Sequence, residues 1–106
     1  MIQQKWMIAA TLLISAVAAM AQVKTGLEVL RERNFDVLQG KRVGLCTNPT
    51  GVDRNLVSTI DILWEAENVN LVALYGPEHG VRGNIYAGDH VDNEVDPKTG
   101  LKMYSL

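Results

Sequence analysis

The chain has 106 residues, a formal net charge of −2, 47% hydrophobic residues and 21% charged residues. This balance is typical of a globular protein and excludes a disordered or collagen-like chain, and its mild acidity gives no reason to expect a nucleic-acid partner. The one cysteine, Cys46, excludes an internal disulfide framework and a cysteine-rich zinc site.

Residues 1–21 have the three-part layout of a secretory signal peptide. Lys5 is their only charged residue, Trp6–Val17 is an apolar run with two hydroxyl residues in it, and Ala19-Met20-Ala21 fits the small-x-small cleavage pattern. An uncleaved membrane anchor is the alternative, but a spanning helix needs about 20 apolar residues. We therefore expect cleavage after Ala21, a periplasmic or secreted protein, and no stable membrane insertion after cleavage.

A capping box opens the first helix predicted after the signal peptide. Thr25 can accept a hydrogen bond from the Glu28 backbone, while the Glu28 side chain reaches back to Thr25. We expect this helix to run to about Arg33, with Leu27 and Leu30 facing inward.

A strand, a helix and a second strand follow, and this order predicts a βαβ unit. The apolar runs at residues 42–47 and 70–75 are bounded by turn residues, which indicates buried strands. Between them, apolar residues at helical spacing predict a helix with one core-facing stripe. That stripe consists of Leu56, Ile60, Leu63 and Trp64. Cys46, in the first strand, is predicted to be a small buried core residue.

The last part of the chain is more polar. Residues 89–96 predict a solvated acidic loop, residues 97–100 a turn, and residues 101–106 a further strand. Two helices cannot cover both faces of a parallel sheet. We therefore expect residues 22–106 to be the amino-terminal piece of a longer α/β protein. The alternative is a complete small domain with an exposed last strand, which carries an aggregation risk.

Two polar loops, residues 48–53 and 76–83, follow the predicted strands. In open α/β sheets, ligands bind beyond the carboxyl ends of the strands. Glu78 is the strongest candidate for catalysis, since a carboxyl group can donate or accept a proton. His79 can share the proton transfer, and Arg82 can bind an anionic group. A purely structural or solvated Glu-His pair is the alternative.

Three further residues are candidates for binding substrate. Asn48 and Thr50 can donate to sugar hydroxyls or phosphate, although such side chains often only satisfy a turn backbone. Asp89 can reach the same site. A metal site built from His79, Asp89 and His90 lacks the usual ligand spacing, and the first loop lacks the ending of a P-loop. We therefore expect neither a metal nor a cofactor.

Four stretches of the sequence resemble the amino-terminal part of the DUF1343 family, which includes the exo-β-N-acetylmuramidases. They are residues 44–52, 75–83 with the Gly76-Pro77-Glu78-His79-Gly80 motif, 87–88 and 96–106. The resemblance covers about residues 25–106. It implies a two-domain protein whose catalytic amino-terminal domain is Rossmann-like, with a mostly parallel sheet and flanking helices, and of which residues 22–106 are the first part.

The resemblance also implies an activity. Such enzymes hydrolyse a β-1,4 bond and release N-acetylmuramic acid from the non-reducing end of a peptidoglycan-derived muropeptide or disaccharide, in cell-wall turnover or recycling. Glu78 carries over as the proposed catalytic residue, and Asn48, His79 and Arg82 carry over as pocket residues. Arg82 would then pair with the lactyl carboxylate of the sugar.

The implied reaction needs more than the residues named so far. Glycoside hydrolysis usually uses two carboxyl groups, so we expect the second one beyond Leu106 and no activity from the truncated chain alone. A non-catalytic muropeptide- or sugar-binding module, an inactive fragment, and a metal- or phosphate-dependent hydrolase are the alternatives.

Overall fold

The computed structural model describes residues 4, 6–8, 22–77, 79–83 and 94–106. Within these ranges, no helix is long and apolar enough to cross a membrane. The predicted signal peptide lies almost entirely outside them. The elements after residue 21 are helix α2 (Gly26–Glu32), the 3-10 helix η1 (Asp36–Leu38), strand β1 (Arg42–Cys46), helix α3 (Thr59–Glu65), and strands β2 (Asn70–Gly76), β3 (Glu94–Val95) and β4 (Lys102–Ser105).

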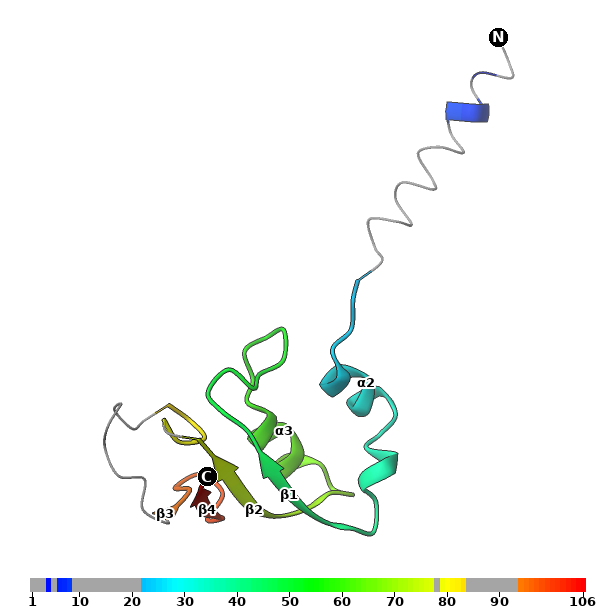
Figure 1. Ribbon diagram of the computed structural model, residues 1–106. Helices are drawn as coiled ribbons and strands as arrows, with labels where there is room; N and C mark the ends of the chain where they lie inside the picture. The colour runs from blue at the N-terminus through cyan, green and yellow to red at the C-terminus, as the bar shows by residue number, and fades with distance from the viewer. Residues whose placement is uncertain (1–3, 5, 9–21, 78, 84–93) are drawn as a thin grey trace.

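The strands form one four-stranded sheet in the order β1-β2-β4-β3 (Figure 1). β2 pairs in parallel with β1 on one side and with β4 on the other, while the short β3 pairs antiparallel with β4. The mostly parallel α/β sheet with flanking helices and the βαβ unit are therefore confirmed. The two-residue β3 was not predicted, because it is too short to show an apolar pattern.

One hydrophobic core joins the helices to a single face of the sheet. Ile60 of α3 and Leu74 of β2 are fully buried at its centre. The other buried members come from helix α3, from strands β2 and β4 and from two loops. They are Phe35, Leu63, Leu71, Val81 and Met103. Leu30 of α2 and Leu45 of β1 pack against this cluster, as the sequence predicts for Leu30. Leu27, also predicted to face inward, is half-buried outside the cluster.

The opposite face of the sheet carries small and aromatic side chains. Tyr75 and Tyr104, neighbours on β2 and β4, stack with ring centroids 5.2 Å apart. A Cβ atom at Gly44 would lie only 3.0 Å from the Tyr75 ring, so this position suits glycine. Cys46 is opposite Tyr75 and is exposed, so its prediction as a buried core residue is wrong. The reason is the alternation along β1, which directs Leu45 to the core and Cys46 away from it.

Helix α3 is shorter than the apolar stripe suggests. It begins at Thr59, because the Ser58 side chain accepts the Ile60 N–H and caps the helix. Leu56 lies outside it with a φ of 62° and is 80% exposed. Trp64, at the last turn, is 45% exposed. Both were predicted in the core and neither is there. Leu56 is excluded because Asp53 organises the loop before the helix.

Asp53 holds that loop through its side chain and ties it to α2. Its Oδ1 accepts the N–H groups of Asn55 and Val57, each at 2.9 Å. Its Oδ2 accepts from Arg31 Nη2 of α2 at 2.9 Å. The next residue, Arg54, makes the second connection to α2.

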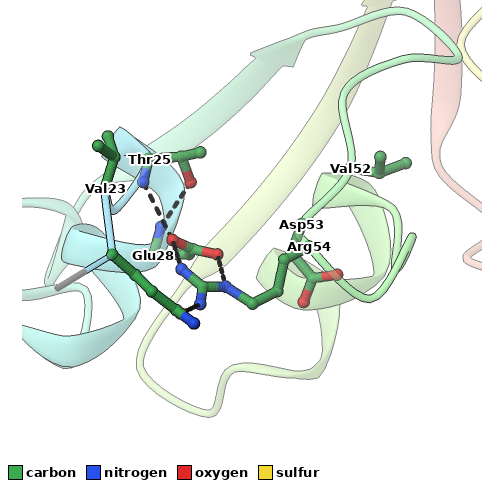
Figure 2. Close-up of a pocket in the computed structure, with 7 residues that line it drawn as sticks. Val23, Thr25, Glu28, Val52, Asp53 and Arg54 are labelled. Atoms are coloured by element: carbon green, nitrogen blue, oxygen red, sulfur yellow. Dashed lines mark hydrogen bonds and ion pairs between the residues drawn. The ribbon is translucent and has the colours of Figure 1, made fainter. Parts of the chain in front are cut away.

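The predicted capping box is present, and it is joined to Arg54 (Figure 2). The Thr25 N–H donates to Glu28 Oε2 at 3.0 Å, and the Glu28 N–H donates to Thr25 Oγ1 at 3.3 Å. Arg54 donates to both Glu28 oxygens, at 2.6 and 2.7 Å, and also to Gln22 Oε1. The bond from Arg54, followed by the Thr25 backbone donor, lowers the pKa of Glu28 from 4.5 to about 2.

The Glu28 contact should give the fold a specific acid sensitivity. Because the folded-state pKa lies below the unfolded one, the contact stabilises the fold fully above about pH 4.5, and this contribution disappears as the pH falls toward 2. Urea denaturation should show a loss of unfolding free energy in Glu28→Gln that is largest near neutral pH and shrinks below pH 4.5.

The matched control for this experiment is Glu32→Gln on the same helix, since Glu32 forms an exposed ion pair with Lys24. Its effect should be small at every pH. A Glu28→Gln effect that stays constant from neutral pH to pH 2 would contradict the assignment.

Alanine substitutions at Ile60 and Leu56 test which residue of the predicted stripe is packed in the core. Ile60→Ala should lower the free energy of unfolding by about 2–5 kcal/mol, because a fully buried side chain leaves a cavity. Leu56→Ala, at an exposed position, should change it by less than about 0.5 kcal/mol. Equal losses in urea denaturation would mean that Leu56 is packed in the core.

Candidate functional site

The carboxyl ends of the parallel strands meet at one edge of the sheet, and both predicted loops begin there. The Thr47 N–H donates to the Tyr75 carbonyl at 2.9 Å, which places the end of β1 beside the end of β2. The two loops also touch, because a Cβ atom at Gly83 would lie 3.0 Å from Pro49 Cγ. The two loops therefore lie side by side at this edge, which is where the sequence predicts that each of them follows its strand.

The loop after β2 is fixed to the domain at several points. The Gly80 N–H donates to the Pro77 carbonyl at 2.8 Å, joining the backbone on either side of residue 78. Val81 is buried in the core and packs so closely on Gly76 that a Cβ there would lie 2.8 Å from Val81 Cγ1. Gly80 and Gly83 have φ values of 71° and 75°, a region that favours glycine.

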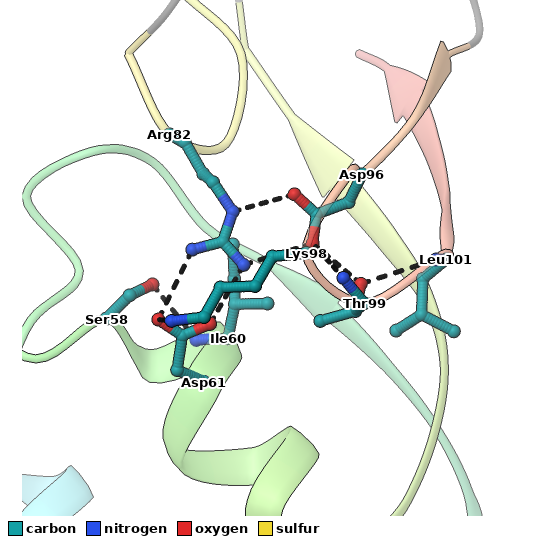
Figure 3. Close-up of polar contacts among 8 residues, drawn as sticks. All are labelled: Ser58, Ile60, Asp61, Arg82, Asp96, Lys98, Thr99 and Leu101. Atoms are coloured by element: carbon teal, nitrogen blue, oxygen red, sulfur yellow. Dashed lines mark hydrogen bonds and ion pairs between the residues drawn. The ribbon is translucent and has the colours of Figure 1, made fainter.

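Arg82, near the end of this loop, lies between two carboxylates (Figure 3). Its Nε donates to Asp96 Oδ1 at 2.7 Å, and its Nη2 donates to Asp96 Oδ2 at 3.0 Å, which is a bidentate pair. Nη2 also donates to Asp61 Oδ1 at 2.9 Å, and Nη1 donates to Asp61 Oδ2 at 3.4 Å. All three guanidinium nitrogens thus donate to a carboxylate of this domain.

Asp96 is the buried centre of this group. Its side chain is 1% exposed, and its Oδ2 accepts from the Thr99 N–H at 3.1 Å and from Thr99 Oγ1 at 2.7 Å as well as from Arg82. The bond from Arg82 lowers the pKa of Asp96 despite its burial. Asp96 was predicted in a solvated acidic loop. That prediction is wrong for this residue, because paired donors make burial of the charge tolerable.

Asp61 brings helix α3 into the same group. Asp61 is buried, although it is not part of the core-facing stripe that the sequence predicts for this helix. Lys98 Nζ donates to Asp61 Oδ2 at 2.8 Å from a side chain that is 60% exposed. The bond from Arg82 lowers the pKa of Asp61, and the bonds from Asp96 and Asp61 raise the pKa of Arg82. We call Asp61, Arg82, Asp96 and Lys98 the Arg82 cluster.

The remaining predicted site residues divide into two groups. Asn48, Thr50 and His79 are described and exposed at the edge where the strands end. Asn48 Oδ1 accepts from the Thr50 N–H at 3.2 Å and from Thr50 Oγ1 at 2.9 Å, so the pair also satisfies its own turn. Glu78 and Asp89 lie outside the described residues. The roles assigned to all of these side chains stay predictions.

Sequence reasoning missed the partners of Arg82. One signal could have found Asp96: the run Asp96-Pro97-Lys98-Thr99-Gly100 has the composition of a turn in which an aspartate bonds the backbone ahead of it. No such signal marks Asp61, whose partners are distant in sequence. In the part of the chain that the structure describes, no group of three or more His, Cys, Asp or Glu side chains could hold a metal ion.

The described elements define a mostly parallel α/β domain of the Rossmann-like class, with two polar loops meeting at the carboxyl edge of its sheet. Residues 43–106, which include both loops, match the family model for the exo-β-N-acetylmuramidase NamZ, N-terminal. The chain belongs to this family, and its resemblance to the DUF1343 proteins is confirmed.

Two relatives give the extent of the similarity. The chain is 51% identical over 85 residues to the peptidoglycan beta-N-acetylmuramidase NamZ of Bacillus subtilis (strain 168), a match that covers 80% of this chain and 20% of the relative. It is 67% identical to a crystallised DUF1343 family protein from Bacteroides fragilis NCTC 9343, with a TM-score of 0.68 over 77% of this chain and 20% of that one. The chain thus spans about one fifth of the length of these relatives.

Proposed function

We propose that the protein to which this domain belongs is an exo-acting glycoside hydrolase that releases N-acetylmuramic acid from the non-reducing end of peptidoglycan fragments. The observation that carries this proposal is the 51% identity with an enzyme named as a peptidoglycan beta-N-acetylmuramidase. The family match supports it further, because residues 43–106 contain both loops at the carboxyl edge of the sheet.

Within this proposal, the loop after β2 supplies the catalytic groups. Glu78 transfers a proton to or from the reacting sugar, or stabilises the positive charge that develops on it, and His79 assists the proton transfer. His79 is exposed at the edge where the strands end, which is where a substrate can reach it. A second carboxylate is expected beyond Leu106. The buried Asp61 and Asp96 are already bound to Arg82 and are not candidates for this role.

The loop after β1 supplies binding groups in this proposal. Asn48 and Thr50 are exposed in the turn that packs toward Gly83, and amide and hydroxyl groups suit sugar hydroxyls. Asp89 is a further proposed contact. The substrate is a peptidoglycan-derived muropeptide or disaccharide, and the reaction serves cell-wall turnover or recycling.

Glu78→Gln in the full-length protein tests the proposed catalytic role. The amide cannot exchange the proton, so kcat on a chromogenic β-muramide should fall by about 100-fold or more. Glu67→Gln, an exposed residue in the turn after α3, is the matched control and should retain activity. Undiminished activity of Glu78→Gln would remove Glu78 from the mechanism. An inactive wild-type protein that still binds the sugar would indicate a binding module instead.

We also propose that residues 1–21 direct export and are removed after Ala21, so that the protein is periplasmic or secreted. Peptidoglycan lies outside the cytoplasmic membrane, so export would bring the enzyme to the compartment in which peptidoglycan fragments are released. The proposed cut would leave the first contacts of α2 intact, since Gln22 accepts a hydrogen bond from Arg54 and Thr25 caps α2.

Mass spectrometry of the amino-terminal peptide tests this proposal. The mature protein should begin at Gln22, and Ala21→Lys should block cleavage because the peptidase requires a small residue there. Ser15→Thr, within the apolar run, is the control and should still be cleaved. A wild-type protein that starts at Met1 would contradict the proposal.

A further inference from the structure

We propose that Asp61 and Asp96 are positioning residues for the proposed hydrolysis, and that they act through Arg82 to fix the loop that carries Glu78 and His79. This inference rests on the proposed function and deepens it. In this proposal Arg82 supports the loop and does not bind the lactyl carboxylate of the sugar.

The first argument is where Arg82 is attached. It directly follows buried Val81 and precedes Gly83, the residue that packs on Pro49 of the other loop. Its two partners come from separate parts of the fold, Asp61 from α3 and Asp96 from the turn between β3 and β4. The guanidinium therefore ties the end of the β2 loop to a helix on one side and to the far edge of the sheet on the other.

The second argument is that four of the five N–H donors of Arg82 are already used. Nε and Nη2 form the bidentate pair with Asp96, and Nη1 and Nη2 bond Asp61. A substrate carboxylate could bind this guanidinium in a bidentate way only by displacing one of these carboxylates. Displacement of Asp96 would leave a carboxylate that is 1% exposed without its counter-charge, which is strongly unfavourable.

The third argument is the rigidity of the partner. Asp96 also accepts two hydrogen bonds from Thr99, and its own backbone bonds Leu101 and Gly100 at 2.8 and 2.7 Å. Such a fixed acceptor sets the guanidinium plane and hence the end of the loop. Catalytic rates respond strongly to displacements of about 1 Å, so a support of this kind acts on kcat without touching the substrate.

The test compares Asp96→Asn, Arg82→Met and Arg82→Lys in the full-length protein. The control is Arg33→Met, which removes an exposed arginine that pairs with Asp36. Each variant is measured for kcat and KM on a chromogenic β-muramide, and for inhibition by N-acetylmuramic acid relative to N-acetylglucosamine. Amide hydrogen exchange across residues 77–83 is measured below the melting temperature of each variant, and it does not depend on activity.

The proposal expects Asp96→Asn and Arg82→Met to behave alike. Both should lower kcat by about 10- to 100-fold, leave KM within about twofold, keep the preference for the muramic inhibitor, and speed amide exchange in residues 77–83. Arg82→Lys should recover part of the kcat, because it keeps one charged donor. Arg33→Met should match the wild type in every measurement.

Other results would overturn the proposal. If Arg82→Met raises KM and abolishes the preference for the muramic inhibitor while Asp96→Asn has no effect, Arg82 contacts the substrate. Unchanged amide exchange across residues 77–83 in both variants would show that the loop does not depend on the cluster. An inactive wild-type protein would count against the proposed function, and the exchange measurement would still decide the positioning role.

Discussion

The paired burial of one positive and two negative charges is the constraint on which the carboxyl edge of this domain depends. The Arg82 side chain, from the loop after β2, donates hydrogen bonds to Asp61 of α3 and to Asp96 in the turn before β4. Asp96 is almost fully inaccessible to solvent, so the cluster forms as a whole or leaves a buried charge uncompensated. Three segments distant in sequence are therefore held in one arrangement.

This constraint acts together with the apolar core. Val81 inserts into the core beside Ile60 and Leu74, one residue before Arg82, so the loop is fixed by an apolar contact and by a charged one in succession. Gly83 then packs on Pro49 and brings the loop after β1 alongside. The carboxyl edge of the sheet thus carries exposed polar groups such as Asn48 and His79 on two loops that pack against each other and onto the core.

Local patterns in the sequence predict the parts of this fold that local interactions create. The Thr25–Glu28 capping box and the turn at residues 97–100 are present, because neighbouring residues suffice to form them. The two long strands are present as well, since apolar runs mark them, although their parallel pairing joins residues that are distant in sequence. The side chains that depend on distant partners could not be predicted in this way. Asp96 has an acidic, loop-like context but is buried, since Arg82 is 14 residues away in sequence. Leu56 fits a helical stripe, yet Asp53 and the Ser58 cap exclude it from α3.

In the candidate site, too, some features follow from the sequence pattern and others depend on residues that are distant in sequence. The position of both loops follows from strand order, whereas the direction of the Arg82 side chain follows from partners on other elements. A crystal structure of the full-length protein with bound N-acetylmuramic acid tests this account most directly. We expect the sugar against the loops at residues 48–51 and 77–83, with Arg82 still bonded to Asp61 and Asp96. A guanidinium that has left both carboxylates to bind the lactyl group of the sugar would contradict the account.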